Sequence, residues 1–351
     1  MDSPPQRPAH RALTIVGGGV IGLTCALTAA DAGWRVRVLD AGTDERASWV
    51  AGGMLGSLGE GHPGEDASLA LSVESVRLWP ALVKRLDDPG VVTATDSLFV
   101  AASATDIEYL RHLADFVWAG QPATDAALQS VTGRDIRTLE PSLSSRLVGG
   151  YRAVGEWSVD NRRLLEALRA AATSAGAELV SARVESLGDL GSDTQILLAA
   201  GLGTAALWPG VDLHAAKGEI LRLRRTRWSV PPPGHVVRAR LHGRAVYLVP
   251  REDGVVVGAT QYEAEGIADR APQAGGVADL LADAIEVFPG LRTYELTEAG
   301  AGLRPCTADG LPIVTRVDTR TVVATGHGRN GIVLAPGTAA RVLSILEGAE
   351  E

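Results

Sequence analysis

Three glycines near the start of the chain have the spacing of a dinucleotide-binding turn. Gly17, Gly19 and Gly22 follow a short apolar run and precede a stretch compatible with a helix. The first glycine permits a tight turn, the second lets the backbone approach a pyrophosphate, and the third lets the helix close onto the strand. The phosphates would lie on the helix N-terminus, where free N–H groups and the helix dipole favour negative charge.

An acidic residue follows at the distance that such a site requires. Asp40 ends the alternating segment 34–40, about 20 residues after the first glycine. A carboxylate there can accept hydrogen bonds from both ribose hydroxyls and would repel a 2′-phosphate. Because the chain holds 41 glycines, the glycine spacing alone is a weak signal. The strand, turn, helix, second strand and terminal acid together predict dinucleotide binding.

An arginine near the C-terminal end is placed to bind a carboxylate. Arg304 lies among glycines and a proline in residues 299–312, a stretch too irregular for a helix surface. A guanidinium group is a flat fork that holds a carboxylate by two parallel hydrogen bonds, and a rigid loop keeps it aimed. We expect Arg304 to bind a substrate carboxylate. The alternative is a structural ion pair with an acid such as Asp309.

A second glycine-rich turn follows at residues 326–331. It presents backbone N–H groups ahead of the apolar segment 332–346, in which Pro336 either sets a first helical turn or kinks the helix. Arg329, within the turn, either closes the substrate end of a site or pairs on the surface. His327 is expected to contact a cofactor through its backbone, without an acid or base role.

Size and charge limit the class of protein. With 351 residues, 46% of them hydrophobic, and a mean hydropathy of +0.10, the chain is expected to form two lobes from interleaved segments. The net charge of −9 argues against nucleic acid or an anionic membrane as partner. Cys25 and Cys306 cannot form a disulfide scaffold, which fits a reducing cytosol. Residues 1–10 are expected to be a flexible tail, and the lack of a signal peptide or membrane helix makes a cytoplasmic protein the default.

The periodicity of apolar residues predicts two kinds of sheet. The continuous apolar segment 194–201 is typical of a buried central strand in a parallel sheet. Residues 217–258 alternate instead, as in a mostly antiparallel sheet with one wet face. Another strand is expected over 177–184. Helical spacing predicts helices over 23–32, 68–86, 104–118, 161–175, with Asp160 as N-cap, and 275–287.

The segment 46–56 indicates which dinucleotide is bound. It contains the sequence ASWVAGGML and follows the ribose-binding acid at once. A flexible loop is the plainest interpretation. The segment resembles the Ser/Gly stretch that runs along the flavin in the glycine oxidase branch of the D-amino-acid oxidase superfamily, enzymes that feed thiazole synthesis in thiamine production. The motifs VYLVPREDGVVVGATQYE, AGLRPCTADGLP and ATGHGRNGIVLAP resemble the same family, in order and over nearly the whole chain.

The resemblance implies an α/β fold with FAD as cofactor. It implies a Rossmann-like FAD-binding domain of the glutathione-reductase type, interleaved with a mostly antiparallel α+β substrate domain. We assign residues 11–80, 150–212 and 300–351 to the FAD-binding domain, and residues 81–149 and 213–299 to the substrate-binding domain.

Site residues are carried over by position. The resemblance implies substrate-carboxylate binding for Arg304, an active-site tyrosine at Tyr247 and a pocket arginine at Arg329. A helix N-terminus behind the second glycine turn would stabilise a reduced, anionic flavin. The residues expected at the cofactor are Gly17, Gly19, Val20, Ile21, Gly22, Asp40, Ala41, Ala47, Ser48, Gly52, Gly53, Met54, Val184, Gly201, Gly326, His327, Gly328, Arg329, Asn330, Gly331, Ile332 and Val333. No metal site is expected.

Two positions depart from the family pattern. Gln261 stands where a methionine is expected near the substrate, which leaves the side-chain preference open. Cys306 stands where a glycine or methionine is usual, and it is expected to be a small packed residue. In the related sarcosine oxidases a cysteine bonds to the flavin, but that position aligns with Gly302. We therefore expect a noncovalent flavin.

The implied reaction is the oxidation of glycine, sarcosine or a small D-amino acid by hydride transfer from the α-carbon to flavin N5, with O₂ as acceptor. No general base is evident near Arg304, which favours a site that works by orientation. The alternatives are a sister oxidase or dehydrogenase on the same fold, a nicotinamide-dependent dehydrogenase, and a noncatalytic flavin-binding subunit. The resemblance also suggests as partners a thiazole synthase of the thiamine pathway and further copies of the chain.

Overall fold

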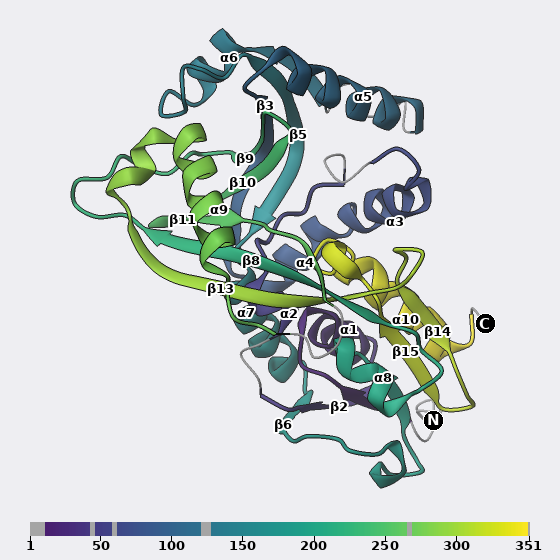
Figure 1. Cartoon of the computed structure of the whole chain (residues 1–351). Coiled ribbons are helices and arrows are strands. Elements are labelled where there is room, and N and C mark those ends of the chain that lie inside the picture. Colours follow the sequence, from purple (N-terminus) through teal and green to yellow (C-terminus); the bar gives the residue numbers. More distant parts are fainter. Residues whose placement is uncertain (1–10, 43–45, 58–61, 121–127, 265–268, 350–351) are drawn as a thin grey trace, which may run out of the picture.

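Two β-sheets, each with its own helices, form the frame of the molecule, as the computed structural model in Figure 1 shows. The first sheet occupies the lower part of that view and the second the upper part. The expected tail lies outside the described residues. The structure describes residues 11–42, 46–57, 62–120, 128–264 and 269–349.

The first sheet has six strands in the order β14-β15-β7-β1-β2-β6. All its neighbours are parallel except the edge pair β14 and β15. Every residue of β1 is buried, as expected of a strand covered on both faces. The strands come from distant parts of the sequence: β1 (Ala12–Val16), β2 (Arg35–Asp40), β6 (Glu178–Ser181), β7 (Gln195–Leu198), β14 (Ile313–Arg316) and β15 (Thr321–Thr325).

Apolar helices cover this sheet. α1 packs against both α7 and α10, and the three share one core in which Leu23, Leu168 and Val342 are buried. α1 is apolar nearly all round, which suits a helix enclosed by neighbours. The helices of this part are α1 (Val20–Asp31), α2 (Ala47–Val50), α3 (Asp66–Val76), α4 (Trp79–Leu86), α7 (Asn161–Ser174), α8 (Thr204–Leu207) and α10 (Ala335–Glu347).

The second sheet has nine strands in the order β12-β8-β11-β10-β9-β3-β5-β4, with β13 also paired to β8. Its pairs are antiparallel except β3 with β9. The strands are β3 (Val92–Ala101), β4 (Leu128–Thr132), β5 (Gly149–Val159), β8 (His214–Arg224), β9 (Val236–Leu241), β10 (Arg244–Arg251), β11 (Gly254–Gly258), β12 (Tyr262–Ala264) and β13 (Glu295–Cys306).

The two faces of the second sheet differ. α6 (Gly133–Leu139) and α9 (Ala274–Val287) cover one face, where Leu221, Leu248 and Leu280 belong to one buried core. The opposite face carries Phe99, which packs with Leu110 of α5 (Ala104–Gly120). α5 packs mainly against β3 and β5, at one end of that face. The rest of the face is available to build a site.

The mixed fold with one parallel and one mostly antiparallel sheet confirms the predicted fold class. β5 and β13 both belong to the second sheet, although the sequence assigned 150–159 and 300–306 to the FAD-binding domain. The domain boundaries stay a prediction.

Some element boundaries differ from those predicted. The single helix expected over 68–86 is two helices, α3 and α4, because Pro80 lies in the first turn of α4 and proline cannot donate to an uninterrupted helix. α10 begins at Ala335, so that Pro336 sets a first turn. The strand expected over 177–184 is shorter, and Asp160 caps α7 as predicted.

Candidate active site

A cavity of about 780 Å³ extends from the glycine turn after β1 to the open face of the second sheet. Its lining includes the carboxyl ends of β1, β2 and β7, together with residues of β8, β9, β10, β11 and β13. Ligands of open parallel α/β sheets bind beyond the carboxyl ends of the strands. The cavity therefore joins a dinucleotide position on one sheet to a reaction position on the other.

The glycine turn has no room for side chains. A Cβ on Gly17 would lie 2.3 Å from the carbonyl oxygen of Ala199, and one on Gly22 would lie 1.9 Å from the carbonyl oxygen of Gly17. Gly17 also has a φ of +115°, a backbone conformation that glycine adopts without strain. Close approach of backbone at the start of α1 is what a bound pyrophosphate needs, so this end fits FAD.

Asp40 stands at the end of β2 with its carboxylate already fixed. It is buried and lines the cavity. Arg46 Nη2 lies 3.0 Å from the carboxylate, Arg169 forms a second ion pair with it, and the Gly42 N–H donates to it at 3.2 Å. This network orients the carboxylate at the edge where the ribose of a dinucleotide lies.

The Ser/Gly segment lies against both sheets. The Ser48 hydroxyl accepts a hydrogen bond from the Val20 N–H at 3.4 Å, at the first residue of α1. Gly53 has a φ of +87°, and a Cβ on it would lie 2.1 Å from the carbonyl oxygen of Val159. A Cβ on Gly52 would lie 3.0 Å from the Tyr247 ring. The segment is therefore packed too closely for side chains at these two glycines, and its backbone lies along the cavity.

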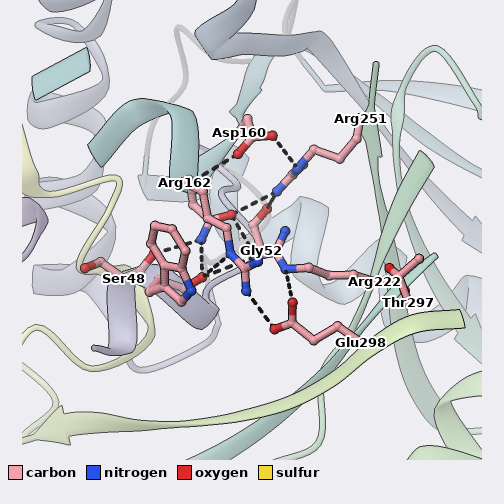
Figure 2. Close-up of polar contacts among 10 residues, drawn as sticks. Ser48, Gly52, Asp160, Arg162, Arg222, Arg251, Thr297 and Glu298 are labelled. Carbon is pink, nitrogen blue, oxygen red and sulfur yellow. Dashed lines mark hydrogen bonds and ion pairs between the residues drawn. The ribbon is translucent and has the colours of Figure 1, made fainter. Parts of the chain in front are cut away.

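A cluster of polar side chains behind this segment holds its carbonyl groups (Figure 2). Asn161 Nδ2 donates to the carbonyl oxygens of Ser48 and Trp49, at 2.8 and 2.7 Å. Arg251 donates to the Gly52 carbonyl at 2.8 Å, and Arg222 donates to Trp49 at 3.2 Å. Because α2 ends at Val50, the carbonyls of its last turn have no helical partner of their own, and Asn161 and the arginines supply the donors instead.

Three arginines, Arg162, Arg222 and Arg251, outnumber the two carboxylates of this cluster, Asp160 and Glu298, and the side chains of Arg222 and Arg251 are largely buried. Arg222 and Arg251 both donate to Asn161 Oδ1 at 3.2 Å. Asp160 lies 3.4 Å from Arg251 Nε, and Glu298 lies 3.9 Å from Arg222 Nε. Burial lowers the pKa of Arg251 to about 10 and also lowers the pKa of Arg222. Both stay charged at neutral pH and place positive potential behind the segment.

Arg304 lies on β13 with part of its guanidinium group unengaged. A Cβ on Gly218 of the neighbouring strand would lie 2.2 Å from Arg304 Nη2, so the glycine makes room for the fork. Arg304 Nη1 is buried and has no hydrogen-bond partner among the residues that the structure describes. Asp309, the alternative ion-pair partner, instead accepts a hydrogen bond from the Leu311 N–H at 3.0 Å. A buried donor without a partner favours a ligand that accepts from it.

Tyr247 lies on β10 and lines the same cavity. In the sheet it is directly opposite Gly258 on one side and Arg238 on the other. A Cβ on Gly258 would lie 2.3 Å from the phenol oxygen, so the ring lies flat across the glycine. Gly52 and Gly258 therefore leave space for the ring in this orientation, which sets the direction in which the hydroxyl points.

The second glycine turn has two contrasting side chains. Arg329 lines the cavity and also forms an ion pair with Glu65, so it combines the two predicted alternatives. The His327 side chain points away from the cavity. Its Nε2 lies 2.9 Å from the hydroxyl of Thr338, which belongs to α10. Burial lowers the pKa of His327 to about 4, which keeps the imidazole neutral.

The structure brings the predicted site residues together. All of them line the cavity except Gly22 and Gly326, which lie behind it. Their roles as contacts stay predictions. The sequence did not lead us to several cavity-lining residues on the second sheet and α5. The alternation of residues 236–241 could have indicated the two arginines among them. The missed residues are Phe99, Tyr109, Leu110, Leu113, Arg238 and Arg240.

The described residues contain neither a metal-binding cluster nor a membrane-spanning helix. No three His, Cys, Asp or Glu side chains in the part of the chain that the structure describes lie together as metal ligands would. Across the same described ranges, no helix combines the length and apolar character needed to cross a membrane.

Comparison with known proteins identifies close similarities over nearly the whole chain. Residues 12–344 match the family described as DAO, FAD dependent oxidoreductase. The bifunctional protein ThiO/ThiG of Trichormus variabilis is 31% identical over 362 residues, which cover 96% of this chain and 52% of that protein. The chain thus spans about half the length of the ThiO/ThiG relatives that it matches.

A relative of similar length has a solved structure. The glycine oxidase of Geobacillus kaustophilus is 31% identical over 362 residues, covering 95% of this chain and 92% of that protein. Its crystal structure superposes with a TM-score of 0.85 at 30% identity, covering 98% of this chain and 96% of the other.

Proposed function

The chain belongs to the family of FAD-dependent oxidoreductases, and we propose that it oxidises small amino acids, with glycine as a substrate and O₂ as the electron acceptor. The observation that carries this proposal is Arg304, whose buried Nη1 has no partner among the described residues and which shares one cavity with the FAD-binding turn. The similarity to glycine oxidases at about 30% identity supports the same substrate class.

Arg304 holds the substrate carboxylate through its planar fork, and Tyr247 donates a further hydrogen bond to it. The chemistry supplied by bound FAD is acceptance of a hydride from the α-carbon and delivery of two electrons to O₂, which gives hydrogen peroxide. The imine product hydrolyses in water, so that glycine gives glyoxylate and ammonia. The carboxylates that line the described cavity, Asp40 and Glu185, belong to the ADP end. Orientation of a neutral amine therefore drives the reaction, without a carboxylate base.

Two sources of positive potential favour the reduced cofactor. Arg222 and Arg251 lie behind the Ser/Gly segment, and α10 begins just beyond the second glycine turn, with its N-terminus toward the cavity side. Negative charge gathers on the flavin when it is reduced, so fixed positive charge near it stabilises that state.

The flavin is held noncovalently. Gly302, the position where related enzymes carry a flavin-linked cysteine, lines the cavity and has no thiol, and Cys306 Sγ instead lies 3.6 Å from the Arg304 carbonyl oxygen. Acid precipitation should release the yellow colour into solution. Colour that stays with the pellet would contradict noncovalent binding.

The partner proposal rests on the ThiO/ThiG relatives, which join this kind of chain to a further part. We propose that the imine passes to a thiazole synthase of the thiamine pathway in the cytoplasm. Further copies of the chain are a second candidate partner, and light scattering of the purified protein tests this.

The visible spectrum of the purified protein before and after anaerobic glycine tests the main proposal. An oxidised-flavin spectrum that bleaches on addition of glycine is expected. A colourless protein, or a flavin that no amine bleaches, contradicts it, and the latter would identify a noncatalytic flavin-binding subunit. Peroxide formed in air with glycine, sarcosine or D-alanine ranks the substrates. Bleaching without peroxide would identify a dehydrogenase.

A further inference from the structure

Two arginines of β9 lie on the face of the second sheet that forms the cavity. Arg238 is directly opposite Tyr247, and Arg240 is directly opposite Ala245. Residues opposite one another in an antiparallel pair share a face, and so do residues two apart along a strand. Arg240 is therefore a diagonal neighbour of Tyr247, about 7–8 Å away between Cα atoms, which an arginine side chain can span.

The surroundings of Arg240 leave its guanidinium group open to a ligand. Its cross-strand neighbours are small, Ala245 on β10 and Ala101 on β3. The guanidinium carbon lies 3.8 Å from the centre of the Tyr109 ring of α5. Within the described residues no carboxylate lies within ion-pair distance of Arg240. A ring face holds the cation in place and leaves its N–H donors to bind elsewhere.

The substrate end of the cavity is strongly positive. Arg238, Arg240, Arg270, Arg304 and Arg329 all line it. Three of these have further interactions, among them the ion pair of Arg329 with Glu65. For Arg304 and Arg240 the described residues offer no carboxylate partner. Clustered charge of one sign in a cleft raises the local concentration of oppositely charged ligands.

We propose that Arg240, stacked on Tyr109, binds a second carboxylate of the substrate, so that the site accepts amino acids with two carboxylates. This inference rests on the proposed amine oxidation. Arg304 would bind the carboxylate next to the reacting carbon, and Arg240 would bind the carboxylate on the far side of the nitrogen or on a side chain. Tyr109, Leu110 and Leu113 would enclose the carbon chain between them.

Iminodiacetate is a suitable probe because its secondary amine lies between two carboxylates. A hydride leaves one α-carbon, and the iminium that results adds water and splits into glyoxylate and glycine. The overall balance is one iminodiacetate, one O₂ and one water giving glyoxylate, glycine and hydrogen peroxide. The product glycine is itself a substrate of the proposed activity, so initial rates are needed.

The experiment measures kcat and KM from initial peroxide formation with iminodiacetate, D-aspartate, glycine and sarcosine. The variants are Arg240→Met, Arg240→Lys and Tyr109→Leu. Arg137→Met, on the exposed part of α6, is a matched arginine control. The wild type should use iminodiacetate at least about tenfold more efficiently than sarcosine, as charge-assisted hydrogen bonds predict.

Arg240→Met should raise KM for the two dicarboxylates about tenfold or more and change glycine and sarcosine less than about threefold. Arg240→Lys should retain part of the preference, because it keeps a cation, and Arg137→Met should retain all of it. An equal loss for all four substrates, or no preference in the wild type, overturns the inference while leaving the amine oxidase proposal intact.

Binding can be measured without turnover. Glutarate carries two carboxylates and no amine, and butyrate carries one carboxylate. Glutarate should raise Tm of the wild-type protein more than butyrate does, and Arg240→Met should remove the difference. If glutarate discriminates but no amine is oxidised, the proposed function fails and the second carboxylate site stands. Equal Tm shifts with both acids overturn the site.

Discussion

The two ends of the cavity are built in different ways. The ADP end consists of bare backbone around Gly17 and Gly22, with Asp40 as its side-chain anchor, and these residues are close in sequence. The substrate end consists of arginine and aromatic side chains on β9, β10 and β13 and on α5. Recognition by backbone groups requires a particular local conformation of the chain, and a contiguous sequence motif encodes that conformation. Side-chain recognition needs only that the right residues meet in space.

The largest effect is expected at the substrate end, from Arg304→Leu. Loss of the charged fork should cost about 3–5 kcal/mol in kcat/KM for glycine, more than a hundredfold, because a carboxylate would be left in a desolvated pocket without its partner. Flavin content should stay as in the wild type, since the ADP end is untouched. Glycine turnover within a few-fold of wild type would contradict carboxylate binding by Arg304.

The cluster between the two ends should respond next, through Arg251→Met. Its loss removes the arginine donor to the Gly52 carbonyl and one of the two arginine donors to Asn161 Oδ1, which leaves Arg222 as the other. We expect the free energy of unfolding to fall by about 3 kcal/mol and FAD to dissociate more readily, as measured by urea unfolding and ultrafiltration. Arg85→Met, which breaks the exposed pair with Asp31, is the control and should change stability by less than about 1 kcal/mol. Equal effects of the two variants would refute a special role for the cluster.

At the ADP end, Gly22→Ala should have a smaller but distinct effect. The added Cβ would meet the Gly17 carbonyl oxygen at 1.9 Å, which forces α1 away from β1 and costs about 1–3 kcal/mol. FAD affinity should fall with stability, while KM for glycine in the FAD-saturated enzyme should be nearly unchanged. Gly275→Ala on α9 adds a Cβ into open space and is the matched control. A change in KM for glycine with unchanged FAD affinity would contradict the assignment of this turn to the ADP end of the cavity.

The smallest effect concerns pH and His327. Its pKa is about 4 in the folded protein and about 6.5 in the unfolded chain, so between these values the unfolded state binds the extra proton. Stability is therefore fully present above the unfolded pKa and falls as the pH drops toward 4. Between pH 7 and 5.5 the loss should be about 1 kcal/mol. Urea unfolding of wild type and His327→Gln checks this, because the variant should lack that share of the pH dependence.

Features that lie within a short stretch of sequence could be predicted, whereas contacts between distant residues could not. Gly17, Asp40 and the Ser/Gly segment could be predicted because each lies within a short motif whose spacing is set by backbone geometry. The single helix predicted over 68–86 was wrong because the apolar spacing continues across Pro80, which fits the first turn of a helix but not its interior. The role of Arg251 behind Gly52 was missed since 199 residues separate them. No local pattern marks such a contact.

The sequence by itself determined the two sheets and the cofactor. Strand periodicity and backbone-shaped motifs are local properties, and their match to FAD-dependent oxidoreductases extends over residues 12–344. Only the tertiary structure decided which further side chains lie near the predicted substrate residues. Strand register set Arg238 and Arg240 beside Tyr247, and helix packing brought Tyr109 over Arg240. Register and packing are fixed by the whole core, so these neighbours appear only when the chain is folded.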